Sequence, residues 1–258
     1  MKKDFFALLI FCTLAISALA QFPVDPQRNT NSPAVFTNLN NVIGKTVVDN
    51  VVYYKSDMTG LVDGIPLYRV TGSRFWNDQW QVASLYDNNN KILARIPVRL
   101  NLNFSSIHYL DKSGEELFLD PEIIKKVIFY TDTIHFIPAA TFISFVPYIY
   151  FGKEKLNDYL QVMNQGTASL LKYQRKLIYS TDSAFGTQKS YSFKSESYYY
   201  LWFKIKAEPL KRLSKDALFE LLPRARSFEK WVIENKLNLK KEEDVITFLN
   251  YYNSQIQE

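Results

Sequence analysis

Cysteine is almost absent from this chain, and that absence excludes several kinds of chemistry. The only cysteine among the 258 residues, Cys12, lies in an apolar run near the N-terminus. No disulfide can form within the chain, and the rest of it has no cysteine nucleophile. The protein must therefore be held together by burial of apolar surface, which a chain of this length can achieve.

Histidine and glycine are also scarce. The two histidines, His108 and His135, stand far apart in strand-like segments and lack the short spacing of a metal site. The chain has eight glycines, and Gly152 lacks the upstream glycines of a phosphate-binding loop. Ser73 follows a glycine but has no second glycine after it, so no nucleophile elbow is present. We expect no bound metal and no cofactor.

Long apolar runs are missing too, and the most prominent one lies in the first twenty residues. Lys2 and Lys3 precede an apolar run from Phe5 to Ala20, which ends in small residues. This run is too short to span a bilayer, and no stop-transfer pattern follows it. We expect residues 1–20 to be a secretory signal peptide, the mature chain to start near Gln21, and no transmembrane segment to remain after cleavage.

The remaining chain divides into three parts by composition. Residues 21–41 are rich in proline and asparagine, which predicts a linker. Residues 42–209 alternate short β-type runs with turn residues, and residues 210–258 show helical spacing. The predicted fold class is α+β: an antiparallel β meander, either a curved sheet or a sandwich, followed by a C-terminal cap of about three short helices.

Strand-like composition recurs along the β domain. The expected strands are 46–54, 79–86, 91–100, 105–110, 115–119, 123–130, 134–137, 159–164 and 168–179. Pro97 indicates an edge or a bulge in its strand, because proline cannot donate to a ladder. Residues 153–163 also fit a helix, since their apolar positions recur at helical spacing.

Helical signals follow the β domain. Ser214 is expected to cap a first helix, which ends before Pro223. A second helix carries an apolar stripe and ends near Lys236. The third begins with acidic residues at 242–244, where they complement the helix dipole, and carries a clear apolar stripe.

Aromatic residues are unusually abundant, with 17 Tyr, 19 Phe and 4 Trp making up 16% of the chain. The run 198–203 places rings on both faces of a strand, so it must be covered on both sides or must line a groove. Tryptophans flanking polar residues suit a sugar or an apolar ligand. The candidate ligand-binding residues are Trp76, Trp80, Tyr198, Tyr200 and Trp202; the alternative is that these rings only fill the core.

Positive charge is concentrated near the C-terminus. The whole chain carries a formal charge of +5, and residues 204–241 contain eleven basic side chains against five acidic ones. A basic cap favours phosphate-bearing lipid or polysaccharide, whereas so mild an overall charge does not indicate nucleic acid. The candidate polyanion-binding residues are Lys211, Arg212, Arg224 and Arg226; the alternative is a solvated helix face.

Catalytic residues are not identifiable from the sequence. A glycosidase needs only two acids at a suitable separation, and these can come from distant parts of the chain. The available acids are Asp57, Asp63, Asp78, Glu115, Glu116 and Asp120, and nothing in the pattern singles out a pair. A hydrolase therefore remains an alternative without assigned residues.

Several segments together resemble a known group of proteins. They are Trp80–Tyr86, Ile96–Leu100, Tyr159–Gly166, Leu170–Lys176, Leu237–Asp244 and Tyr251–Asn253. Over roughly residues 71–253 the chain resembles an uncharacterised group of secreted envelope proteins common in Bacteroidota. That group has no established activity, so the resemblance implies a Gram-negative envelope setting and no particular chemistry. The Asn-rich turn at 87–90 departs from the Asp-Gly or Asn-Gly turn of the group.

The sequence thus predicts a protein exported to the periplasm or outer surface of a Gram-negative bacterium. The function expected is a non-enzymatic binding or scaffolding module, with an envelope protein, glycan or lipid as partner. The alternatives are a hydrolase acting on envelope glycan or lipid, and a periplasmic carrier of an apolar ligand.

Overall fold

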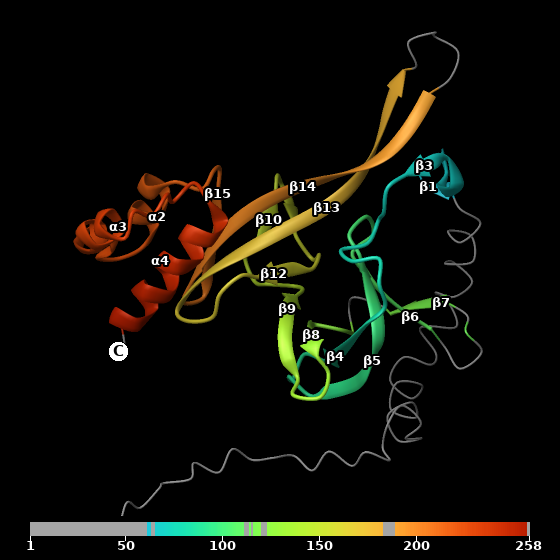
Figure 1. Ribbon diagram of the computed structural model, residues 1–258, viewed down its shortest axis with the longest axis horizontal. Coiled ribbons are helices and arrows are strands. Elements are labelled where there is room, and N and C mark those ends of the chain that lie inside the picture. The colour runs from blue at the N-terminus through green and yellow to red at the C-terminus, as the bar shows by residue number, and fades with distance from the viewer. Residues whose placement is uncertain are drawn as a thin grey trace, which may run out of the picture. The chain divides into compact units, whose positions relative to one another are not determined.

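The computed structural model describes residues 61–62, 65–110, 114, 116–119, 123–182 and 189–256 (Figure 1). The expected signal peptide, the linker and the strand predicted at 46–54 lie outside these residues. The protein is mostly β-sheet, with 48% in strands and three helices at the C-terminal end. A β-rich chain followed by helices is what the α+β prediction required, so the fold class is confirmed at that level.

One sheet of eleven strands dominates the structure. Its strands are β3 (Val70–Thr71), β4 (Gln81–Tyr86), β5 (Ile92–Asn101), β6 (Ser106–Leu110), β7 (Glu116–Leu119), β8 (Lys126–Asp132), β9 (Ile137–Ile143), β12 (Leu160–Val162), β13 (Ala168–Asp182), β14 (Lys189–Phe203) and β15 (Lys206–Leu210). Two small hairpins lie outside it: β1 (Leu61–Val62) with β2 (Ile65–Pro66), and β10 (Tyr150–Phe151) with β11 (Glu154–Lys155). A short 3-10 helix, η1 (Leu67–Arg69), links β2 to β3.

The sheet order is β15-β14-β13-β12-β9-β8-β4-β5-β6-β7, with β3 added to β14. Every pair along this order is antiparallel, and only β3 runs parallel to its partner. The order departs from a simple meander at one point, because β8 pairs with β4 rather than with β7. The sheet is not closed.

The turn between β8 and β9 corrects one sequence prediction. Residues 134–137 were expected to form a strand, but only Ile137 belongs to one. The Asp132 carboxylate accepts hydrogen bonds from the backbone N–H groups of Ile134 (2.7 Å) and His135 (3.1 Å), and Phe136 has a φ of 51°. This side-chain capping reverses the chain where an apolar pattern alone indicates extension.

Two other local predictions are decided by the pairing. The segment 153–163 forms no helix; it contains β11 and β12, and β12 pairs with β13 as an antiparallel hairpin. Pro97 pairs with Val82 of β4, while the ladder to β6 starts only at Val98. Pro97 therefore occupies a part of β5 whose second edge has no partner strand among the described residues, which suits a residue without an N–H group.

The C-terminal helices are α2 (Lys215–Leu221), α3 (Glu229–Glu234) and α4 (Glu242–Gln255), with the 3-10 helix η2 (Ala225–Phe228) between the first two. The hydroxyl of Ser214 accepts a hydrogen bond from the N–H of Ala217, so the predicted cap is confirmed. Three acidic residues occupy the first turn of α4. In the described residues no helix is long and apolar enough to cross a membrane.

Both faces of the long hairpin of β13 and β14 are covered over the part nearest the helices (Figure 1). On one face Leu170 and Leu201 share a core with α2, α3 and α4. On the other, Leu171 and Tyr200 share a core with the segment from Val146 to Leu156, which contains β10 and β11. The aromatic run 198–203 is therefore sandwiched between two layers and does not line an open groove there.

Helix α4 is bound to the sheet by the Asn253 side chain, whose amide group hydrogen-bonds a strand residue as a neighbouring backbone would. Asn253 accepts a hydrogen bond from the N–H of Ala168 and donates one to its carbonyl, both at 2.8 Å. Gly166 makes room for this contact, because a Cβ at that position would overlap the Asn253 side chain. The turn between β12 and β13 is thus locked to the helix.

Candidate functional site

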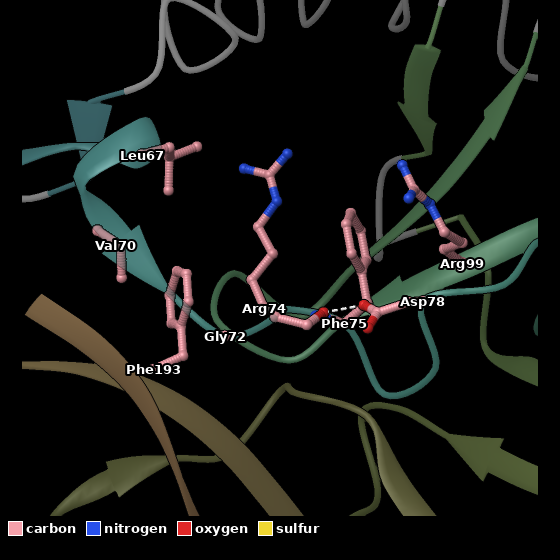
Figure 2. A pocket seen from close by; sticks show the side chains of 9 residues that line it. Leu67, Val70, Gly72, Arg74, Phe75, Asp78, Arg99 and Phe193 are labelled. Atoms are coloured by element: carbon pink, nitrogen blue, oxygen red, sulfur yellow. Dashed lines mark hydrogen bonds between the residues drawn. The ribbon is translucent and has the colours of Figure 1, made fainter.

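A pocket of about 530 Å³ lies beside the short strand β3 (Figure 2). Its walls combine apolar rings and chains with two arginines. The lining residues are Leu67, Val70, Gly72, Ser73, Arg74, Phe75, Asp78, Arg99 and Phe193. The site is an open depression with polar and apolar groups in similar proportion, so any ligand bound there would keep part of its surface in water.

The segment from Gly72 to Phe75 builds one side of the pocket. Gly72, at a φ of 86°, turns the chain away from β14 directly after β3. The Ser73 hydroxyl accepts a hydrogen bond from the N–H of Phe75 and donates one to Asp78, which holds the turn. The carbonyl of Arg74 accepts a hydrogen bond from the N–H of Leu102, so the backbone that carries Arg74 is fixed from both sides.

Among the residues that the structure describes, the Arg74 guanidinium is the cation of the site that has no acidic partner. In Figure 2 its side chain extends into the space bounded by Leu67, Val70 and Phe193 on one side and by Phe75 on the other. Its guanidinium carbon lies 5.1 Å from the centre of the Phe75 ring. No carboxylate pairs with Arg74 among the residues that the structure describes. A guanidinium in this position is available to bind an anion.

Arg99, in contrast, is held in place by its neighbours. It forms an ion pair with Glu116 at 2.8 Å, and both side chains are mostly buried. Its guanidinium lies over the Phe75 ring at 4.0 Å and over the Trp80 ring at 4.1 Å. These cation–π contacts and the carboxylate fix both its position and its orientation.

Behind this wall lies His108, whose side chain is completely buried. The amide oxygen of Asn101 accepts hydrogen bonds from two backbone N–H groups, those of Asn103 and Phe104, so its NH₂ group faces the histidine Nε2 at 3.3 Å. Nε2 therefore accepts, and Nδ1 carries the proton donated to Glu116 at 2.7 Å. The network selects one neutral tautomer of the imidazole.

The pKa shifts agree with this assignment. Burial lowers the pKa of His108, and the hydrogen bond and charge of Glu116 oppose the effect only in part. The charges of Arg74 and Arg99 lower the pKa of His108 further. Burial raises the pKa of Glu116, but its hydrogen bond from His108 and the charge of Arg99 outweigh burial, so its pKa lies below the ordinary value. Near pH 7, His108 is neutral and Glu116 ionised.

Ser106 completes a chain of three groups. Its hydroxyl lies 3.1 Å from Nε2 of His108, on the side of the ring opposite Glu116. This order of hydroxyl, imidazole and carboxylate is that of a serine hydrolase. Ser106 is only 6% exposed, however, and does not line the pocket. Phe75, whose ring meets the His108 ring edge-on at 5.1 Å, stands at the pocket side of this chain.

The five candidate ligand-binding aromatics lie mainly in packed positions. Trp76 contacts the core rings of Phe129 and Phe142 at 5.1 and 5.2 Å. Trp80 lies on Arg99 and is the one candidate next to the pocket. The three strand residues, Tyr198, Tyr200 and Trp202, pack against the layer that contains β10 and β11.

The four candidate polyanion-binding residues do not form part of this pocket. Lys211, Arg212, Arg224 and Arg226 are all exposed, and they flank or belong to α2 and η2. Within the described residues none of the four forms an ion pair. Their position agrees with a basic surface and equally with a solvated helix face.

Other chemistry suggested by the sequence is not assembled in the described part of the chain. No cluster of three metal-binding side chains occurs there. His135 forms an exposed pair with Asp132 at 2.6 Å, in the turn between β8 and β9. The candidate acids Asp57, Asp63, Glu115 and Asp120 lie outside the described residues.

Comparison with known proteins adds no relative. No protein-family model, no curated protein and no solved structure matches this chain. The function must therefore be argued from the site itself.

Sequence reasoning identified His108 and Glu116 as separate residues but did not join them, and it missed Arg74, Arg99 and Ser106. Ser106 and His108 stand two apart in a strand, which places them on one face. That spacing was the one sequence signal that could have linked Ser106 to His108. Arg74 gives none, because it is a lone arginine in an irregular segment.

Proposed function

We propose that the protein is an exported, non-enzymatic binding module of the bacterial envelope, and that Arg74 binds an anionic group of its ligand. The observation that carries this proposal is the Arg74 guanidinium, which enters the pocket without a carboxylate partner among the described residues. An arginine left unpaired between apolar walls gains most from an anion that displaces water there.

The lining favours an anion attached to an apolar group. Leu67, Val70 and Phe193 provide apolar surface beside Arg74, while Asp78 is already engaged by Ser73. Carboxylates and phosphates are the anions that a guanidinium binds through two parallel hydrogen bonds. The ligand class that we propose is therefore an amphipathic carboxylate or phosphate.

The test is isothermal titration of the purified protein with hexanoate and hexyl phosphate, with 1-hexanol as the uncharged control. Both anions should bind at least about tenfold more tightly than the alcohol, since a charge-assisted pair contributes about 1.5–3 kcal/mol. Arg74→Ala should remove this preference and Arg74→Lys should keep part of it. Arg69→Ala, a nearby exposed cation outside the pocket lining, is the matched control. An unchanged preference in Arg74→Ala would falsify the proposal.

A hydrolase is the second candidate, and the chain of Ser106, His108 and Glu116 favours it. The required experiment is reaction with a fluorophosphonate probe, followed by mapping of the labelled residue. Labelling at Ser106 that is lost in Ser106→Ala would replace the binding module with a hydrolase. If no labelling occurs, the role of Ser106, His108 and Glu116 is to hold Arg99 and Phe75 in place.

A carrier of an apolar ligand is the third candidate. The volume of the pocket is sufficient for one, but two arginines, Asp78 and Ser73 interrupt its apolar wall. Native mass spectrometry of protein purified gently from the envelope of its own host separates the cases. A tightly bound lipid without an anionic group would favour the carrier, and an anionic ligand would favour the binding module.

A further inference from the structure

One edge of β14 is left open between two partner strands. On this edge β3 pairs with Tyr191 and Ser192, and β15 pairs with residues 199–203. The residues between them, 193–198, pair with β13 on the opposite edge only. Among the described residues no strand covers this interval. An open edge of this kind accepts an added strand.

The register shows which backbone groups the open edge presents. The Tyr191 carbonyl faces this edge, because it accepts a hydrogen bond from the Thr71 hydroxyl of β3. At the other end, the two-residue turn between β14 and β15 makes Phe203 and Lys206 a hydrogen-bonded pair across the same edge. Alternate residues face alike, so Ser195 and Ser197 turn their N–H and C=O groups outward, whereas Phe193 faces the same edge but lies against Gly72, directly after β3.

The side chains leave this edge accessible. Lys194, Ser195 and Ser197 are exposed, and none of them is bulky and apolar. Lys194 inclines toward the Tyr179 ring, 5.2 Å away on the neighbouring strand β13. The two outward-facing residues, Ser195 and Ser197, match the ladder that a peptide segment of about three or four residues forms.

The open edge ends at the pocket. Phe193, at which the open edge ends, lines the pocket, and Gly72 lies against the backbone of Phe193. A peptide that pairs antiparallel to β14 runs from Tyr198 toward Phe193, so its C-terminus arrives at the pocket. Figure 2 shows the Arg74 side chain between Phe193 and Val70 on one side and Phe75 on the other.

We propose that this edge binds an extended peptide by antiparallel strand addition, with its terminal carboxylate on Arg74 and an apolar last side chain against Val70 and Phe193. The proposal rests on the anion-binding function of Arg74 and names its ligand as the free C-terminus of a peptide or protein. Charge complementarity selects this occupant: Arg74, which has no acidic partner in the described part of the chain, lies where the peptide would end, and main-chain partners lie along the rest.

The test is binding of random octapeptides, each synthesised with a free carboxylate and as a carboxamide, measured by fluorescence anisotropy. Bound peptides should end in an apolar residue, and amidation should weaken them at least about tenfold. Ser195→Pro removes an outward N–H without touching the ladder to β13, and it should abolish peptide binding. Ser195→Ala keeps the backbone and should bind as before.

Hexanoate separates this inference from the proposed function. If hexanoate binds but no octapeptide does, the strand-addition inference falls and the anion site stands. If neither binds, both fall. Equal peptide binding by the carboxylate and carboxamide forms, or by Ser195→Pro and the unaltered protein, overturns the inference directly. Should Ser195→Pro fail to fold, a bound peptide N-methylated at alternate amides replaces it: loss of binding supports the ladder, and retention refutes it.

Discussion

Two arginine clusters in this protein are built from the same kinds of side chain, an arginine, a glutamate and two aromatic rings, and they differ in their surroundings. In the first, Arg99 pairs with Glu116 at 2.8 Å and lies over the rings of Phe75 and Trp80. In the second, Arg175 pairs with Glu196, also at 2.8 Å, and lies over the rings of Phe151 and Tyr198. We call these the Arg99 cluster and the Arg175 cluster.

The Arg175 cluster is complete in itself. The Glu196 carboxylate accepts hydrogen bonds from the hydroxyls of Tyr179 and Tyr198 as well as from Arg175. These bonds lower the pKa of Glu196 to about 2, with the Tyr179 hydroxyl as the largest cause. Every charge of the cluster has a partner, and the cluster lies on the face of β13 and β14 against which Phe151 packs.

The Arg99 cluster differs in two respects. It is anchored from the interior by His108, and a second cation, Arg74, stands beside it without a partner among the described residues. The contrast teaches that an arginine on aromatic rings is not by itself a site. What distinguishes the two clusters is an unpaired cation next to an opening.

The substitution expected to destabilise the Arg99 cluster most is one that removes His108, which holds Glu116 from the interior. His108→Leu should lower the free energy of unfolding by about 3 kcal/mol, because buried polar groups of Ser106, Asn101 and Glu116 lose their partner. Urea unfolding followed by circular dichroism measures this loss. His135→Leu, at the exposed histidine, is the matched control and should change stability little. Equal effects of the two substitutions would contradict the anchoring role.

The two clusters should also differ in the pH range over which acid lowers the stability of the protein. His108 has a lowered pKa in the folded protein, so acid protonates the unfolded chain first, and stability falls as the pH drops below about 6.5. Glu196 also has a lowered pKa, but its contribution is present above pH 4.5 and is lost only as the pH falls toward 2. Thermal unfolding between pH 7.5 and 5 should therefore report the Arg99 cluster alone.

The control for that measurement is His108→Leu, which should flatten the dependence between pH 7.5 and 5. Glu196→Gln should leave the dependence in this range as it is in the unaltered protein. A pH profile that Glu196→Gln flattens and His108→Leu does not would reverse the assignment.

Much of the fold follows from local patterns in the sequence. Ser214 and the acids at 242–244 mark helix starts that the structure confirms. Alternation and turn residues place most strands, including β12 and β13, which pair as a hairpin. The pairing of β8 with β4 is not a local property, because it depends on which distant strands bury each other's apolar faces. Residues 134–136 were misassigned since the Asp132 cap overrides their apolar pattern.

The site was less accessible to sequence reasoning. Aromatic abundance directed attention to Tyr198, Tyr200 and Trp202, which the structure places against a covering layer. Composition cannot tell a ring that packs from a ring that binds, because both need the same residue type. The link from His108 to Glu116 depends on the register of β6 and β7, and the exposure of Arg74 depends on the turn at Gly72. Neither the strand register nor the direction of the turn can be read from the spacing of residues in the sequence.

Opening the Arg175 cluster should have a smaller effect than removing His108. Arg175→Met keeps the length of the side chain and most of its contact with Phe151 but removes the charge. Because Glu196 keeps two tyrosine hydroxyls and contact with water, the midpoint of urea unfolding should fall less than in His108→Leu. A larger fall than in His108→Leu would place the more important anchor in this cluster. Arg175→Lys should restore part of any loss.

The smallest effect on stability is expected at Arg74, the residue proposed to bind the ligand. Arg74→Ala removes a side chain that pairs with no carboxylate in the described structure, so the free energy of unfolding should stay within about 0.5 kcal/mol. Arg99→Ala should be clearly destabilising, because it leaves Glu116 mostly buried with one charged partner fewer. Urea unfolding of the two variants side by side checks this difference. If Arg74→Ala is the more destabilising substitution, Arg74 is a structural residue like Arg99, and the comparison between the clusters no longer singles out a binding site.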